Sequence, residues 1–182
     1  MTQEEAFLAQ ARSDYLVFER LQEAARSDVS ECHVLHYYQM ATEKLAKALL
    51  ARVGHPVGKT HFAFGRIAAI LAGRQDILTA IGCPNPPVTA RFLARADALF
   101  RQIENLSPDT AGKAAKEKGL AADQGPNVEY PWWQEHPATG PEWLAPAAHT
   151  FPAYQTVTAA SGDGLTLRVF VERLLQGYDR IP

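Results

Sequence analysis

Apolar side chains recur every three or four positions along much of this chain, which is the period of amphipathic helices. The clearest case covers residues 31–53, with polar positions on a second face. Its apolar stripe contains Val34, Tyr38, Ala41, Leu45, Leu49 and Arg52, widened by Leu35 and Val53. Asp28 or Ser30 is the expected N-cap, and Gly54 followed by His55 and Pro56 predicts the end of the helix.

Three further helices are predicted before residue 107. The first covers residues 3–25, with the stripe Leu8, Ala11, Tyr15, Phe18 and Ala25. The third follows Thr60, its expected N-cap, and has an apolar side of Phe62, Ile67, Ile70 and Leu71. The fourth begins after the sequence CPNPP with proline in its first turn. Its stripe is Val88, Phe92, Ala96, Leu99, Ile103 and Leu106.

The composition changes in residues 107–152, which we call the arm. Seven of the 12 prolines and all three tryptophans lie there, and residues 125–150 show no sustained period. Disordered segments are poor in aromatic residues, so we expect an ordered, mostly irregular arm packed over the helices, with a short surface helix near residues 113–118. A last amphipathic helix enters through the sequence SGDG. Its stripe is Leu167, Phe170, Val171, Leu174, Leu175 and Tyr178.

The sequence therefore predicts one all-α domain over residues 1–182, which is a common domain size. We expect an antiparallel bundle of four to five helices with the irregular, aromatic-rich arm inserted before the last helix. Eighteen basic and 20 acidic side chains give a net charge of −2, which argues against a general attraction to nucleic acid or acidic membranes. Two cysteines, no signal sequence and no membrane-length apolar run favour a cytoplasmic protein without membrane contact.

One segment points to a known family. The sequence QMATEKLAKALL, followed by a short loop and Thr60-His61, resembles the second helix and following turn of HEPN domains. These are small helical bundles found in many prokaryotic toxins and in partners of nucleotidyltransferases, and the resemblance covers roughly residues 5–80. It implies a homodimer in a bacterial defence, toxin–antitoxin or stress system. The implied partners are a nucleotidyltransferase or an antitoxin, and the implied ligand is RNA or a nucleotide.

Nuclease members of that family carry an Arg-x4-6-His motif near the last long helix, and this chain lacks it there. Only Arg26 and His33 meet the spacing, at the turn into the second helix. In a metal-independent ribonuclease, histidine would move protons while arginine stabilises charge on the phosphate, so this pair is the candidate catalytic site. The structural alternative is a solvated arginine and a histidine in the first turn of a helix. The misplaced motif favours a non-catalytic protein.

Candidate ligand-binding residues lie on the second face of the helix at residues 31–53. His36, Glu43, Lys44 and Lys47 would line a cleft or dimer interface, with the two lysines contacting phosphates. Alternatively, Glu43 and Lys47 form a surface ion pair contributing about 0.3 to 0.5 kcal/mol. His61 is expected to bind ligand or to pack back against this helix.

The arm supplies a second candidate set. Tyr130, Trp132 and Trp133 could stack on nucleobases near the lysines at 113, 116 and 118, or they could bury themselves against helices. Neither the histidines nor the cysteines have the spacing of common zinc sites, so we expect no metal and no cofactor. Three functions remain: a non-catalytic module binding RNA, a nucleotide or a protein; a metal-independent endoribonuclease; and a dimeric scaffold without a nucleotide ligand.

Overall fold

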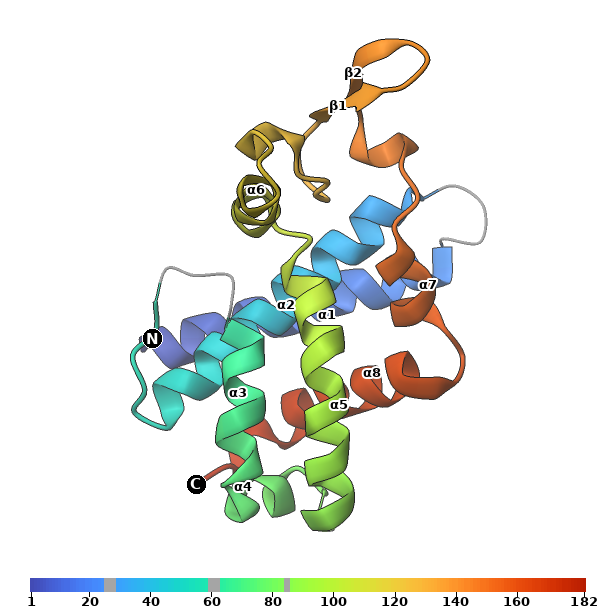
Figure 1. Ribbon diagram of the computed structural model, residues 1–182. Helices are drawn as coiled ribbons and strands as arrows, with labels where there is room; N and C mark the ends of the chain where they lie inside the picture. Colours follow the sequence, from blue (N-terminus) through green and yellow to red (C-terminus); the bar gives the residue numbers. More distant parts are fainter. Residues whose placement is uncertain (25–28, 59–62, 84–85) are drawn as a thin grey trace.

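A computed structural model describes residues 1–24, 29–58, 63–83 and 86–182. The protein is mostly helical, as predicted, with one small two-stranded sheet in addition. Helix α1 (Gln3–Ala24) is followed by α2 (Glu31–Arg52), which runs back alongside it (Figure 1). Both helices lie within about two residues of their predicted bounds, because each has a continuous apolar stripe and Gly54, with a positive φ, follows the C-cap of α2.

Helix α2 is the central element of the fold. It contacts α1, α3, α5 and α7, so its predicted stripe is buried except at Arg52 and Val53, which are partly exposed, and most of its other positions are buried as well. Tyr38 packs between Tyr15 and Phe18 of α1, with ring centroids 6.4 and 4.6 Å away. Burial on nearly every side explains why polar residues on this helix must find partners inside the protein.

Three helices follow α2: α3 (Ala63–Ala72), α4 (Gln75–Ala80) and α5 (Pro86–Glu104). The predicted cap Thr60 and the apolar Phe62 lie outside the described residues. Helix α4 was not predicted, since six residues are too few to show a period. The buried Glu104 side chain of α5 accepts hydrogen bonds from the backbone N–H groups of Phe64 and Gly65, at 2.7 and 3.1 Å, and so stabilises the first turn of α3.

The core face of α5 matches the predicted stripe only in part. Ala96, Ile103 and Leu106 are buried as predicted, and Leu93 and Phe100 are buried in addition. Phe92 and Leu99, which we expected at the centre, are only partly buried. The helix packs on two neighbours at once: Phe100 meets Phe64 of α3 edge-on at 4.0 Å, and Phe92 meets Phe170 of α8 at 5.4 Å.

The arm has more regular structure than expected. It contains α6 (Pro108–Glu117), the 3-10 turns η1 (Ala122–Gln124) and η2 (Pro146–Ala148), and an antiparallel hairpin of β1 (Trp132–His136) and β2 (Gly140–Leu144). Trp132 lies opposite Leu144, and Trp133 lies opposite Trp143. The hairpin projects beyond the helices at the top of Figure 1. The expectation of packing holds for Trp132, which is 1% exposed, and not for Trp143 in the neighbouring pair of the hairpin, which is 68% exposed.

Two helices close the fold after the arm, α7 (Pro152–Thr158) and α8 (Gly162–Gly177), ending in the 3-10 turn η3 (Tyr178–Arg180). All six apolar positions predicted for the last helix are buried. The chain end is held by hydrogen bonds from Arg52 to the Tyr178 carbonyl, at 3.0 Å, and from Arg180 to the Ala80 carbonyl, at 3.1 Å. In the part of the chain that the structure describes, no helix combines the length and apolar character needed to cross a membrane.

Candidate functional site at the base of the arm

Glu43 of α2 lies at the centre of a buried charged cluster. Its side chain is 2% exposed, and its Oε1 atom accepts hydrogen bonds from Lys47 Nζ at 2.6 Å and Lys44 Nζ at 3.0 Å. The interpretation of Glu43 and Lys47 as a surface ion pair is therefore wrong. Removing one partner of such a pair would leave a buried charge without compensation, which favours a structural role for both lysines. Their ammonium groups are already engaged by Glu43, which leaves them less available to a phosphate.

Asp14 of α1 is a second buried carboxylate near this cluster. Its Oδ1 atom accepts a hydrogen bond from Gln10 at 2.7 Å, while its Oδ2 atom has no hydrogen-bond partner. Burial raises the pKa of Asp14 above its usual 3.8, and the hydrogen bond from Gln10 and the charge of Lys44 offset only part of that effect. Ionisation of the Asp14 carboxyl therefore lowers the free energy of unfolding of the protein.

We expect Asp14→Asn to gain stability relative to the wild type as the pH rises above 3.8. The native state holds the Asp14 proton more tightly than the unfolded chain does, so the wild type loses stability while this carboxyl ionises, and asparagine cannot ionise. Urea denaturation of both proteins at several pH values measures the difference. A difference in unfolding free energy that does not change with pH would contradict the assignment.

Asp76→Asn provides a control of opposite sign. Hydrogen bonds from Arg74 lower the pKa of Asp76 to about 2, so the wild type gains stability from this carboxylate as the pH rises from about 2 to 3.8. The asparagine variant should lose stability relative to the wild type over that window.

The remaining α2 candidates are spread out. His36 lies 3.7 Å from Glu129 of the arm, measured from Nδ1 to Oε1, and so links α2 to the arm. His33 is exposed in the first turn of α2. Arg26 and His61 lie outside the described residues, so the convergence of Arg26 with His33 and the role of His61 stay predictions.

The three arm aromatics have different environments. Trp132 is buried against His149, whose ring meets it edge-on at 5.0 Å, and against Phe151 at 6.3 Å, so its faces are not open to a nucleobase. Tyr130 is 60% exposed and Trp133 is half-buried. The Asn127 side chain accepts hydrogen bonds from the backbone N–H groups of Tyr130 and Glu129, at 2.7 and 3.0 Å, which sets the turn leading to Tyr130.

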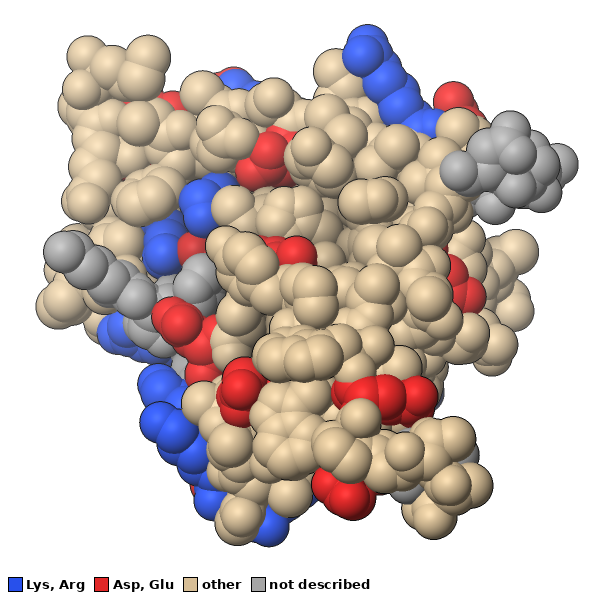
Figure 2. All heavy atoms as spheres, turned by 90° about the horizontal axis from the view of Figure 1, so that it is seen from above, with Lys and Arg blue, Asp and Glu red and all other residues tan. Residues whose placement is uncertain are grey.

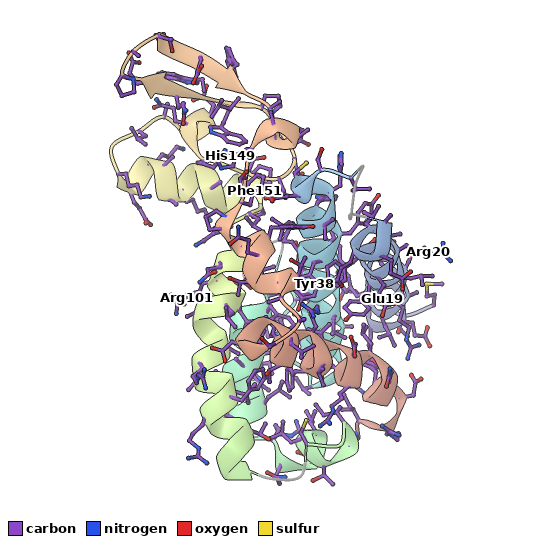
Figure 3. The ribbon with its side chains drawn as sticks, turned by 90° about the vertical axis from the view of Figure 1, so that its right-hand side faces the viewer. Glu19, Arg20, Tyr38, Arg101, His149 and Phe151 are labelled. Atoms are coloured by element: carbon purple, nitrogen blue, oxygen red, sulfur yellow. The ribbon has the colours of Figure 1, made fainter. Side chains whose placement is uncertain are left out.

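A pocket of about 560 Å³ lies at the base of the arm, between the end of α5, α6 and residues 149–153. Figure 3 shows His149 and Phe151 side by side beside α6. The apolar part of the lining includes Leu106, Ala111, Ala114, Ala115, Leu120, Pro126, Phe151, Pro152 and Ala153. The polar side chains are Gln102, Asn105, Lys118, Gln124 and His149. We call this concavity the arm pocket.

Sequence patterns did not identify the arm pocket. Its walls come from three segments spread over about 50 residues of the chain, and none of its amide side chains belongs to a motif. The sequence placed Lys118 among three lysines beside the arm aromatics, without indicating a pocket. The pocket exists because the base of the arm is tied to the helices, through hydrogen bonds from Val128 N to the Leu106 carbonyl at 3.1 Å and from Phe151 N to Glu31 Oε2 at 2.8 Å.

The geometry defines a mostly helical protein with a pocket sized for a small ligand beneath an inserted arm. Within the described ranges, no three histidine, cysteine, aspartate or glutamate side chains are grouped closely enough to hold a metal ion. Comparisons of this chain with protein-family models, with curated proteins and with solved structures found no match.

Proposed function

We propose that this protein is a HEPN-like, non-catalytic module that binds a nucleotide in the arm pocket. One observation carries the proposal: the pocket combines an apolar lining with several amide side chains and one lysine. A nucleobase has apolar faces and a polar edge, and its phosphate is an anion, so each part of a nucleotide has a counterpart in this lining. The α2 sequence QMATEKLAKALL with Thr60-His61 supports the HEPN-like assignment.

The charge around the pocket favours a mononucleotide over a long RNA strand. Residues 108–124 contain three lysines and three acidic residues, and only Lys118 lines the pocket. The face seen from the arm end is mostly uncharged, with lysine and arginine in separate groups (Figure 2). Tight binding of a nucleic-acid strand usually requires several phosphate contacts, which such a surface offers poorly.

The test is isothermal titration of the protein with the four ribonucleoside monophosphates. Lys118→Ala should weaken binding about five- to tenfold, which corresponds to about 1 to 1.4 kcal/mol. Lys116→Ala is the matched control, because Lys116 is exposed in the last turn of α6, two residues before Lys118, and does not line the pocket. No binding at about 1 mM nucleotide, or equal losses in both variants, would contradict the proposal.

The wider role follows from the same proposal. The module acts as a homodimer in a bacterial defence, toxin–antitoxin or stress system, beside a nucleotidyltransferase or an antitoxin. The purified protein is expected not to cleave RNA, because the late-helix Arg-x4-6-His motif is missing. Metal-independent cleavage that is abolished by both Arg26→Ala and His33→Ala would select the endoribonuclease alternative instead.

A further inference from the structure

A second concave surface lies where α1, α7 and α8 meet. A hollow of about 680 Å³ is lined by Tyr15, Glu19, Glu23, Tyr154, Arg168 and Glu172, among others. A neighbouring hollow of about 400 Å³ shares Tyr15, Glu19 and Glu172 with it. The two therefore form one elongated depression, which we call the acidic groove.

The acidic groove contains three carboxylates, those of Glu19, Glu23 and Glu172. Among the described residues, Glu19, Glu23 and Glu172 have no lysine, arginine or histidine within 4.0 Å. Burial raises the pKa of Glu19, and repulsion from Glu172 and then Glu23 raises it further. A cation bound here would relieve this repulsion.

Neither arginine in the lining supplies that cation. Arg12, which lines the smaller hollow, is paired with Asp179 at 3.0 Å. The Arg168 guanidinium donates hydrogen bonds to the carbonyls of Val157 and Ala159, which directs it to the end of α7. The Glu172 Oε1 atom instead accepts a hydrogen bond from the Tyr15 hydroxyl, a neutral group, at 2.9 Å. The groove keeps an excess of negative charge.

An unsatisfied hydroxyl lies behind this wall. Tyr38 is fully buried, and its hydroxyl has no hydrogen-bond partner among the described residues. Burial raises the pKa of Tyr38, Arg168 lowers it and Glu172 raises it. The Tyr38 ring lies 6.4 Å from the ring of Tyr15, which lines the groove. Figure 3 places Tyr38 inside the protein and Glu19 on α1 at its edge. The hydroxyl is an unused hydrogen-bonding group on the groove side of the core.

The spacing of the charges indicates the class of ligand. Glu19 and Glu23 are four residues apart on one helix face, which separates their Cβ atoms by about 5 to 6 Å. No three acidic side chains among the described residues are close enough to hold a metal ion. Tyr15 and Tyr154 line the groove, and tyrosine rings accept both alkyl chains and organic cations.

We propose that the acidic groove binds a linear polyamine, with its ammonium groups at Glu19, Glu23 and Glu172 and its alkyl chain along Tyr15 and Tyr154. The spaced ammonium groups would match three carboxylates that, among the described residues, do not form a group able to hold one metal ion. This inference is independent of the nucleotide proposal, because the acidic groove and the arm pocket share no lining residue.

The experiment is isothermal titration of the full chain with spermidine at constant ionic strength. Glu19→Gln and Glu172→Gln should each weaken binding about fivefold or more. Glu135→Gln is the control, because Glu135 is an exposed glutamate on the hairpin, and it should change binding by less than about twofold. Each variant is checked by thermal denaturation, where Glu19→Gln should unfold at the same temperature as the wild type or higher because it removes a repulsion.

Three outcomes would overturn the proposal. One is the absence of spermidine binding to the wild type. Another is an equal loss in Glu135→Gln, or displacement by Mg²⁺ at the same ionic strength, either of which would mean that spermidine only screens surface charge. The last is binding of a short oligoarginine peptide without binding of spermidine, which would assign the groove to a basic segment of a protein partner.

Discussion

Replacing Trp132 by alanine should destabilise the protein by about 3 to 5 kcal/mol, the usual range for a large aromatic residue removed from a core. Trp132 is 1% exposed and packs on His149 and Phe151, which connect the hairpin to α7. The cavity would lie where the arm meets the helices, so the arm pocket should be lost along with the stability.

Trp143→Ala is the matched control for this prediction, since Trp143 is in the same hairpin and is mostly exposed. It should change the unfolding free energy by no more than about 0.5 kcal/mol. Chemical denaturation followed by circular dichroism measures both variants. Similar losses for the two tryptophans would show that the hairpin does not hold its buried side chain as described.

Phe100→Ala should have the second large effect, also about 3 to 5 kcal/mol. Phe100 is almost fully buried, and its ring meets the buried Phe64 ring edge-on at 4.0 Å, so the substitution removes an aromatic pair as well as apolar contacts. The loss should loosen α3 against α5.

Leu99→Ala, one residue away, tests which face of α5 is in the core. Leu99 is only partly buried, so its replacement should cost clearly less than that of Phe100, about 1 kcal/mol. Urea denaturation of the two variants gives the comparison. If Leu99→Ala were the more damaging change, the helix would be turned toward the stripe that the sequence period alone suggested.

The two proposed sites depend on different parts of the protein. The arm pocket depends on the arm and would be lost with Trp132, whereas the acidic groove is built from α1, α7 and α8. Spermidine binding that survives in Trp132→Ala while nucleotide binding disappears would be the expected pattern. The two measurements together therefore separate local damage to the arm from general unfolding.

The sequence by itself determined the helices whose signals are local. Residues 3–25, residues 31–53 and the last helix have one continuous stripe each, and Gly54 with Pro56 ends α2 through backbone geometry that depends on a few neighbouring residues. The lack of a helical period in residues 125–150 was also visible, although the hairpin there was not. A strand pair forms through contacts between two segments, and neither segment here has a long alternating pattern.

Only the tertiary structure decided which surfaces face each other. In α5, the adjacent residues Leu99 and Phe100 are both apolar, so periodicity could not choose between them, and packing against both α3 and α8 made the choice. Glu43 and Lys47 have the spacing of a surface pair, and they are buried because other elements cover α2. The arm pocket and the acidic groove likewise combine residues from distant segments, whose proximity depends on long-range packing that no local pattern encodes.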